Sequence, residues 1–278
     1  MEKDSILRLS TLSHPHRLAV FRLLMRRYPD KVRAGEIASV LTLKASTTSV
    51  YLSALTDAGL IRQERQGTSL RYSANTGAAA ELIDFLFIDC CRSRPDLCPP
   101  LTKGAQPMTD TTYNVLFICT GNSARSIFAE AILRDLEGGR FKVFSAGTNP
   151  GSKLNPLAVE MLKGKGHDTS LLRSKHISEF QQPESPQMDF VFTVCDQAAN
   201  EDCPAWDGQP ISAHWGLPDP VKADGSLAER RLAFQQTYGA LRNRLKAFAA
   251  LPIDTLDAIS LQAAVDSIGQ DHLEGTPA

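Results

Sequence analysis

Six cysteines fall into two groups of three along the chain, and one of them lies in a motif suited to binding an oxyanion. The motif is VLFICTGNSARS, residues 115–126, in which an apolar run ends at Cys119 and Arg125 precedes a predicted helix. This Cys-x5-Arg spacing turns the N–H groups of a loop toward one point at a helix N-terminus, which favours a tetrahedral oxyanion. The residues predicted to bind it are Thr120, Gly121, Asn122, Ser123, Ala124, Arg125 and Ser126.

The same loop carries groups for nucleophilic chemistry. The positive field at the helix start predicts a lowered pKa for Cys119, which would make its thiolate available as a nucleophile. Arg125 can bind two oxygens of the oxyanion at once. Gly121 and Asn122 suit a sharp turn, and Asn122 could lock it by side-chain hydrogen bonds. Asp219 lies in HWGLPDP, on a loop before a long helix, and could protonate a leaving oxygen.

Two further cysteines bear on which oxyanion is used, since a loop of this kind holds phosphate and arsenate alike. Cys195 and Cys203 lie eight residues apart in TVCDQAANEDCP, a polar segment after a predicted strand. A phosphatase needs neither thiol. Reduction of arsenate needs two electrons, which a second thiol supplies by attacking the sulfur of a Cys119–arsenic adduct, and a third thiol can then carry the disulfide outward. The alternative is an inert structural or zinc pair.

The remaining cysteines, Cys90, Cys91 and Cys98, lie at the end of a predicted helix and across a proline-containing turn. Thiolates select soft metals, and three sulfur ligands without a fourth suit As(III) better than tetrahedral Zn(II). We therefore expect an As(III) site here. The alternative is that Cys90 and Cys91 are small core residues and Cys98 is incidental, because free cysteine is commonly buried.

The N-terminal part is predicted to be mainly α-helical with one hairpin. The apolar spacing predicts helices over residues 6–12, 15–28, 34–41, 46–58 and 78–91. Residues 60–65 and 69–73 have an extended pattern and flank a turn at Gly67. Two short helices followed by a basic hairpin indicate a winged helix-turn-helix, whose second helix enters the DNA major groove. The alternative is a solvated helix pair that binds no nucleic acid.

The second helix of this pair is expected to bury Val50, Ala54, Leu55 and Ala58. The hydroxyl side chains of its first turns would then face DNA, and the arginines of the hairpin would contact phosphates. The residues predicted to bind DNA are Ser46, Thr47, Thr48, Ser49, Tyr51, Arg62, Arg65 and Arg71.

The C-terminal part has the pattern of an α/β fold with a parallel sheet, because apolar runs alternate with helical stretches. The runs cover residues 115–118, 141–144 and 190–194. Helices are predicted over residues 126–136, 156–163 and 227 to about 249, with a weaker one over 256–268.

Composition and charge support two domains with different partners. We expect a DNA-binding and dimerisation domain over residues 1–92, a proline-containing linker over 93–112, an α/β domain over 113–252, and a C-terminal helix and tail over 253–278. Residues 1–106 hold 15 Lys and Arg against 10 Asp and Glu, whereas the rest holds 15 against 21, so the net charge of -1 hides a basic half suited to DNA. No segment resembles a membrane helix or an export signal, so we expect a cytoplasmic protein without a membrane partner.

The segment from Leu7 to about Ala80 resembles the ArsR family of metal-responsive repressors through SVYLSALTDAGLIRQERQGTSLRYS. The resemblance implies a homodimer that binds palindromic operator DNA and is released by a soft metal or metalloid. The Cys-Val-Cys motif of the best-known arsenic sensors is absent, since no cysteine precedes Cys90. The spacing of Cys90, Cys91 and Cys98 is similar instead to that of a subgroup with a C-terminal arsenite site.

Residues 113–250 resemble the low-molecular-weight tyrosine phosphatase fold, with a four-stranded parallel sheet, and within it the thiol-coupled arsenate reductases. The matching segments are CTGNSARS, SAGT at residues 145–148, the segment of Cys195 and Cys203, and HWGLPDP. The resemblance implies that Cys119 is the nucleophile, that Arg125 binds the oxyanion and that Asp219 is the general acid. It also implies a disulfide relay through Cys195 and then Cys203, reduced by thioredoxin, with glutaredoxin as an alternative.

Some relatives bind potassium beside this loop, and Asn122, Glu130 and Ser145 match part of that site. We expect no other tightly bound cofactor. A tyrosine phosphatase of this fold usually has a second loop cysteine, where this chain has Ala124, and tyrosines after the Asp-Pro pair, which this chain lacks.

The leading hypothesis is an arsenite-responsive repressor fused to an arsenate reductase. One alternative is a DNA-binding regulator whose C-terminal domain senses an oxyanion without turnover. The other is a protein tyrosine phosphatase fused to a DNA-binding domain.

Overall fold

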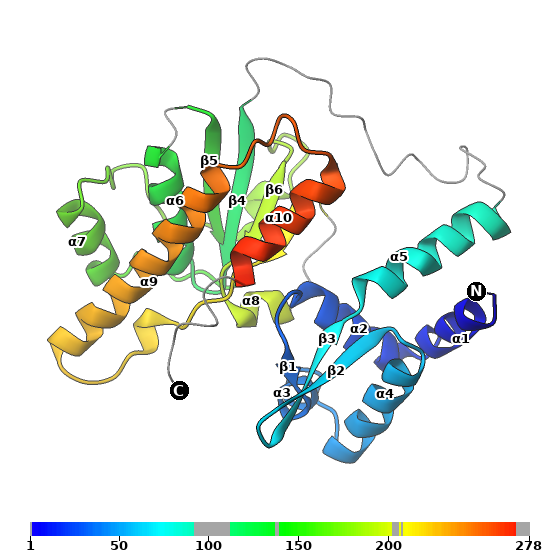
Figure 1. The fold of residues 1–278 in the computed structure, drawn as a ribbon. Helices are drawn as coiled ribbons and strands as arrows, with labels where there is room; N and C mark the ends of the chain where they lie inside the picture. Colours follow the sequence, from blue (N-terminus) through cyan, green and yellow to red (C-terminus); the bar gives the residue numbers. More distant parts are fainter. Residues whose placement is uncertain (1, 92–111, 137–138, 202–205, 207, 271–278) are drawn as a thin grey trace. The chain divides into compact units, whose positions relative to one another are not determined.

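The computed structural model describes residues 2–91, 112–136, 139–201, 206 and 208–270 (Figure 1). The chain divides into two compact units, Met1–Ala105 and Gln106–Ala278. The boundary between them falls within residues 93–112, the predicted linker, and Cys98 lies outside the described residues. No helix within the described ranges is long and apolar enough to span a membrane.

The N-terminal unit is a helical domain with a small antiparallel sheet of order β1-β3-β2. Strands β2 and β3 form the expected hairpin, with Gln66 opposite Ser69 and Gly67 at φ +61° in the turn. The elements are α1 (Glu2–Leu12), α2 (Pro15–Arg26), β1 (Val32–Arg33), α3 (Ala34–Val40), α4 (Ala45–Asp57), β2 (Ile61–Gln66), β3 (Ser69–Ala74), α5 (Thr76–Asp84) and the π-helix η1 (Phe85–Cys90). The predicted winged helix-turn-helix arrangement of helices and hairpin is confirmed.

Helix α4 buries only part of the face expected from sequence: Leu55 and Ala58 are buried as predicted and Ala54 is half-buried, but Val50 is not. Its buried residues are Thr48, Leu52 and Leu55, spaced at i, i+4 and i+7, whereas Val50 is 65% exposed. The prediction that Val50 is a core residue was wrong. Thr48 is 1% exposed, and its hydroxyl donates to the carbonyl oxygen of Lys44 within the helix, at 3.1 Å, so this polar residue can occupy a core position.

The helix predicted over residues 78–91 begins at Thr76 and changes from an α-helix to a π-helix near its end. Residues Phe85–Cys90 form η1, in which no residue is fully buried. Cys90 is exposed and Cys91 is half-buried. The alternative that both thiols are core residues is therefore wrong for Cys90.

The C-terminal unit contains the expected four-stranded parallel sheet, of order β5-β4-β6-β7. The strands are β4 (Tyr113–Cys119), β5 (Phe141–Gly147), β6 (Phe190–Thr193) and β7 (Ile211–His214). The helices are α6 (Arg125–Leu136), α7 (Pro156–Gly164), η2 (Ile177–Phe180), α8 (Asp196–Asn200), η3 (Pro220–Lys222), α9 (Leu227–Ala249) and α10 (Ala258–Gln270). Because all four strands are parallel, their carboxyl ends lie at one edge of the sheet, where the loops with the candidate site residues begin.

Helix α10, which was expected to form a separate C-terminal segment, packs onto this unit. The indole Nε1 of Trp215, just after β7, donates to the carbonyl oxygen of Val265 at 3.1 Å. The buried Arg244 of α9 donates to the carbonyl oxygens of Trp215 and Gly269. Trp215 also stacks on Phe192 of the sheet with ring centroids 4.1 Å apart. Helix α10 thus helps to fix the loop that follows β7.

The buried face of α4 can be tested by truncating two of its side chains. We expect Leu52→Ala to lower the free energy of unfolding of the N-terminal unit by about 2–5 kcal/mol, because it leaves a cavity in the core. Val50→Ala should change it by less than about 0.5 kcal/mol, because Val50 is at the surface. Urea unfolding followed by circular dichroism measures both, and a larger loss for Val50→Ala would refute the observed orientation.

Candidate active site

The thiol of Cys119 lies at the end of β4, inside a loop that folds back over it. Its Sγ accepts a hydrogen bond from the backbone N–H of Asn122 at 3.1 Å and lies 3.0 Å from the hydroxyl of Ser126. Cys119 is only 3% exposed. The strand, loop and helix predicted from the motif are therefore present, and the loop directs polar hydrogens at the sulfur.

Asn122 holds the loop in an unusual conformation. Its φ is +42°, in the left-handed region that non-glycine residues rarely adopt. The fully buried side chain donates to the hydroxyls of Ser126 and Ser145, each at 2.8 Å, and accepts from the backbone N–H of Lys175 at 2.7 Å. The expectation that Asn122 locks the turn by side-chain hydrogen bonds is confirmed.

Gly147, in the SAGT segment at the end of β5, allows the loop to lie directly against the neighbouring strand. A Cβ atom at this position would lie 2.5 Å from the carbonyl oxygen of Thr120 and 3.1 Å from Asn122. The shortest of these contacts is with a backbone oxygen of the loop, which cannot move aside cheaply. The glycine in SAGT was the sequence signal for this close approach. Why a glycine is needed there is visible only in the structure.

Burial raises the pKa of the Cys119 thiol, contrary to the prediction from the motif. Desolvation is the largest cause, and the nearby Cys195 adds to it. The hydrogen bond with Ser126 and the charge of Arg125 act in the opposite direction but do not outweigh burial. The sequence prediction was wrong because it included the positive field of the loop and omitted the loss of water around the sulfur.

Arg125 and Asp219, the predicted oxyanion ligand and general acid, meet at this edge of the sheet. The guanidinium Nη2 lies 2.9 Å from a carboxylate oxygen of Asp219, and Nη1 donates to the carbonyl oxygen of Leu217 at 2.9 Å. Asp219 also accepts from the backbone N–H of Val221 at the start of η3. No sequence pattern indicated that the loop after β7 would bind Arg125 directly.

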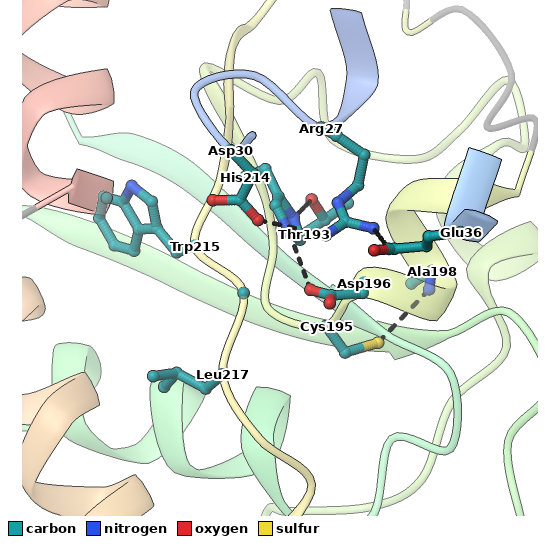
Figure 2. A network of polar contacts seen from close by, with 12 residues as sticks. Arg27, Asp30, Glu36, Thr193, Cys195, Asp196, Ala198, His214, Trp215 and Leu217 are labelled. Carbon is teal, nitrogen blue, oxygen red and sulfur yellow. Dashed lines mark hydrogen bonds and ion pairs between the residues drawn. The ribbon is translucent and has the colours of Figure 1, made fainter. Parts of the chain in front are cut away.

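Cys195 lies beside the Cys119 loop rather than in an exposed polar segment. It follows β6 and caps α8, where its sulfur accepts from the N–H of Ala198 at 3.4 Å (Figure 2). The residue is 1% exposed, and its Sγ lies 3.5 Å from the hydroxyl of Thr120 in the loop. The structure thus brings two of the three predicted relay cysteines together. Cys203 lies outside the described residues.

A buried histidine next to Cys195 was not predicted. His214, which is 1% exposed, contacts the hydroxyl of Thr193 through Nδ1 at 2.8 Å and the carboxylate of Asp196 through Nε2 at 3.2 Å (Figure 2). A Cβ atom at Gly216 would lie 2.6 Å from both members of the Asp196–His214 pair, which explains the glycine in HWGLPDP. This pair ties the segment around Cys195 to the loop that carries Asp219.

The predicted DNA-binding residues of the N-terminal unit are only partly at the surface. Ser46 and Ser49 on α4 and Arg62 and Arg65 on β2 are exposed, and Thr47 is half-buried. Thr48 is 1% exposed, so its assignment to a DNA-facing surface was wrong.

Two other residues of that predicted surface are held by contacts within the domain. Tyr51 contacts His16 at 3.3 Å. Arg71 donates to the carbonyl oxygen of Lys31 at 3.2 Å. Both side chains are half-buried, which leaves the exposed arginines of β2 as the more accessible basic groups of the hairpin.

The fold and the Cys119 loop define a class of protein that comparison with known families confirms. Residues 114–260 match the family of low molecular weight phosphotyrosine protein phosphatases, and residues 12–64 match a helix-turn-helix domain family. The chain belongs to the low molecular weight phosphotyrosine protein phosphatase family and carries a helix-turn-helix domain before it.

Relatives of this chain within that class include several arsenate reductases. The enzyme of Bacillus subtilis (strain 168) is 38% identical over 135 residues, which cover 49% of this chain and 94% of the relative. That of Shouchella clausii is 36% identical over 137 residues, again covering 49% and 94%. A solved structure of an arsenate reductase in its oxidized state is 29% identical and covers 49% of this chain and 98% of that one, with a TM-score of 0.39.

The contact between Ser126 and Cys119 generates a prediction about the thiol. Replacing Ser126 with Ala removes a hydrogen bond that stabilises the thiolate, so the pKa of Cys119 should rise further. Hydrogen bonds to charged groups contribute about 1.5–3 kcal/mol, which corresponds to roughly one to two pKa units.

The thiolate absorbance of Cys119, taken as the difference between each protein and its Cys119→Ser counterpart, measures this pKa. Ser123→Ala, at a half-buried serine of the same loop, is the control. An unchanged or lower pKa in Ser126→Ala would contradict the assignment.

Proposed function

We propose that the C-terminal unit reduces arsenate to arsenite with electrons from its cysteines. The observation that carries the proposal is the position of Cys195, buried beside the Cys119 loop and 3.5 Å from Thr120. A phosphatase reaction uses one thiol and has no role for a second one at this place. The identity of more than a third to named arsenate reductases over this unit supports the same reaction.

The first step is substitution at arsenic. The Cys119 thiol passes its proton to an oxygen of the arsenate anion in the loop, and the resulting thiolate attacks arsenic, so that an S–As bond forms and an As–O bond breaks. The departing oxygen takes a proton from Asp219 and leaves as water or hydroxide, while Arg125 and the loop N–H groups hold the remaining oxygens. Asp219 is suitably placed for this, since it lies 2.9 Å from the guanidinium that would bind the oxyanion.

The second step transfers two electrons. The Cys195 thiolate attacks the sulfur of Cys119, an S–S bond forms, and the S–As bond breaks with its electron pair left on arsenic, which is thereby reduced from As(V) to As(III). Cys203 then attacks Cys195, which releases the Cys119 thiolate and leaves a Cys195–Cys203 disulfide. A dithiol protein such as thioredoxin, or glutaredoxin, restores both thiols.

The reductase proposal is tested by changing the second thiol alone. Cys195→Ser should abolish NADPH consumption with arsenate, thioredoxin and thioredoxin reductase, because the electrons for arsenic can no longer come from Cys195. The fall should exceed about 100-fold, as for loss of an essential participant in a covalent mechanism.

Two controls accompany this assay. Cys90→Ser, which changes an exposed thiol of the other unit, should retain turnover. Hydrolysis of p-nitrophenyl phosphate measures the activity of the Cys119 loop in a reaction that does not use Cys195 or Cys203. Arsenate turnover that survives in Cys195→Ser would rule out the relay, and efficient phosphatase activity without arsenate turnover would favour the phosphatase alternative.

We also propose that the N-terminal unit binds operator DNA as a homodimer and is released by arsenite. The match to a helix-turn-helix family and the exposed arginines of β2 support DNA binding. Exposed apolar side chains on the outer helices support dimerisation, because such surfaces are commonly covered by a partner. They are Ile6, Leu7, Ile83, Leu86 and Ile88.

The arsenite response is assigned to Cys90, Cys91 and Cys98. Cys90 and Cys91 are both accessible to some degree at the end of η1, which suits binding of a soft metalloid from solution. Because η1 continues α5, a ligand bound there would act on the helices at the proposed dimer interface.

The sensor is tested by fluorescence anisotropy with duplex DNA from upstream of the coding sequence. Arsenite should weaken binding of the unmodified protein by roughly 5–150-fold, the usual range of allosteric coupling. The triple variant Cys90→Ser, Cys91→Ser, Cys98→Ser should bind DNA equally well with and without arsenite. Cys195→Ser should keep the response, and release of the triple variant by arsenite would disprove the site.

A further inference from the structure

A buried ion pair lies behind the Cys119 loop. The ammonium group of Lys175 is 3.0 Å from Oε2 of Glu130, and both side chains are 8% exposed. Glu130 belongs to α6, the helix that begins at the loop, whereas Lys175 precedes η2. Buried charges are costly unless they are paired, so each of these groups requires the other.

The pair is connected to the loop by a short chain of hydrogen bonds. The Ser145 hydroxyl donates to the same Oε2 of Glu130 at 2.5 Å and accepts from the side-chain amide of Asn122 at 2.8 Å. The backbone N–H of Lys175 donates to Oδ1 of Asn122 at 2.7 Å. Lys175 therefore supports Asn122 twice, directly through its backbone and indirectly through Glu130.

The oxygens that could bind potassium are already used by these contacts. A monovalent cation beside the loop would need the oxygens of Asn122, Glu130 and Ser145 as ligands. However, Oδ1 of Asn122 accepts from Lys175, the Ser145 oxygen accepts from Asn122, and Oε2 of Glu130 accepts two hydrogen bonds. A cation at Oε2 would also be repelled by the Lys175 ammonium on the same oxygen. While the Lys175 ammonium is bound to Glu130, the donor set does not fit a potassium ion; without that ammonium, the buried Glu130 carboxylate would lack a cation.

We propose that the Lys175 ammonium takes the place of a potassium ion and makes the conformation of the Cys119 loop independent of potassium. Lys175 is a positioning residue in this role, since it acts on Cys119 only through Glu130, Ser145 and Asn122. The inference concerns the loop itself and does not depend on whether the reaction is arsenate reduction.

The unmodified protein provides the first test, by its thermal unfolding in KCl, NaCl and choline chloride at equal ionic strength. We expect the same Tm for the C-terminal unit in all three salts. The thiolate absorbance of Cys119 should likewise titrate with the same pKa in each. A saturable rise of Tm in KCl alone would overturn the proposal.

A variant provides the second test. Lys175→Met removes the ammonium but keeps much of the side-chain volume, which leaves the Glu130 carboxylate buried without its cation. We expect Tm in choline chloride to fall by roughly 5–15 °C, and KCl to restore part of that loss. The pKa of Cys119 in this variant should become potassium-dependent, which a purely structural role of Lys175 would not produce.

Two further variants complete the comparison. Lys163→Met changes an exposed lysine at the end of α7 and should match the unmodified protein in every salt. The double variant Glu130→Gln, Lys175→Met removes both charges, so it should fold even if Lys175→Met does not, and should show no response to potassium. A stable Lys175→Met protein without a potassium response, or a double variant stabilised by potassium, would refute the proposal.

Discussion

The active-site loop depends on the set of hydrogen bonds that fixes Asn122 at a positive φ. A left-handed conformation of a non-glycine residue costs on the order of 1–3 kcal/mol, and it persists only where the surroundings determine it. Here three partners from three segments, Ser126, Ser145 and Lys175, bind the one buried side chain. This conformation points the backbone N–H of Asn122 at the sulfur of Cys119, so the geometry of the nucleophile is determined by residues up to 53 positions from Asn122 in the sequence.

The parallel sheet supplies the second constraint, because it gathers the loops after β4, β6 and β7 at one edge. Cys119 ends the first of these strands, Cys195 follows the second, and Asp219 follows the third. The loops also contact one another: Thr120 reaches Cys195, and Arg125 reaches Leu217 and Asp219. A conformational change in any one loop would therefore alter the contacts of the other two. The packing of α10 against Trp215 stabilises the loop after β7.

Much of this arrangement follows from local sequence patterns, and the parts that do not have a common physical origin. The strand, loop and helix around Cys119 are encoded within twelve residues, so the motif predicts them well. The pKa of Cys119 was misjudged because burial depends on segments distant in sequence. Lys175 carries no local signal, since a single lysine in a polar stretch is usually a surface residue. Thr48 was placed on the wrong face of α4 because its hydroxyl suggested solvent, whereas the backbone of the same helix satisfies it.

The guanidinium of Arg125 is positioned by protein contacts within a buried site before any oxyanion binds. Its two terminal nitrogens are bound to Leu217 and Asp219, while its Nε is buried and has no hydrogen-bond partner among the described residues. A buried donor of this kind is costly unless it serves a ligand. In the proposed reaction an oxyanion that binds the guanidinium must share it with the Asp219 carboxylate, and the two negative groups repel each other. The Asp219 carboxyl group therefore lies beside any oxyanion that Arg125 binds, which is where the proposed reaction needs a proton donor.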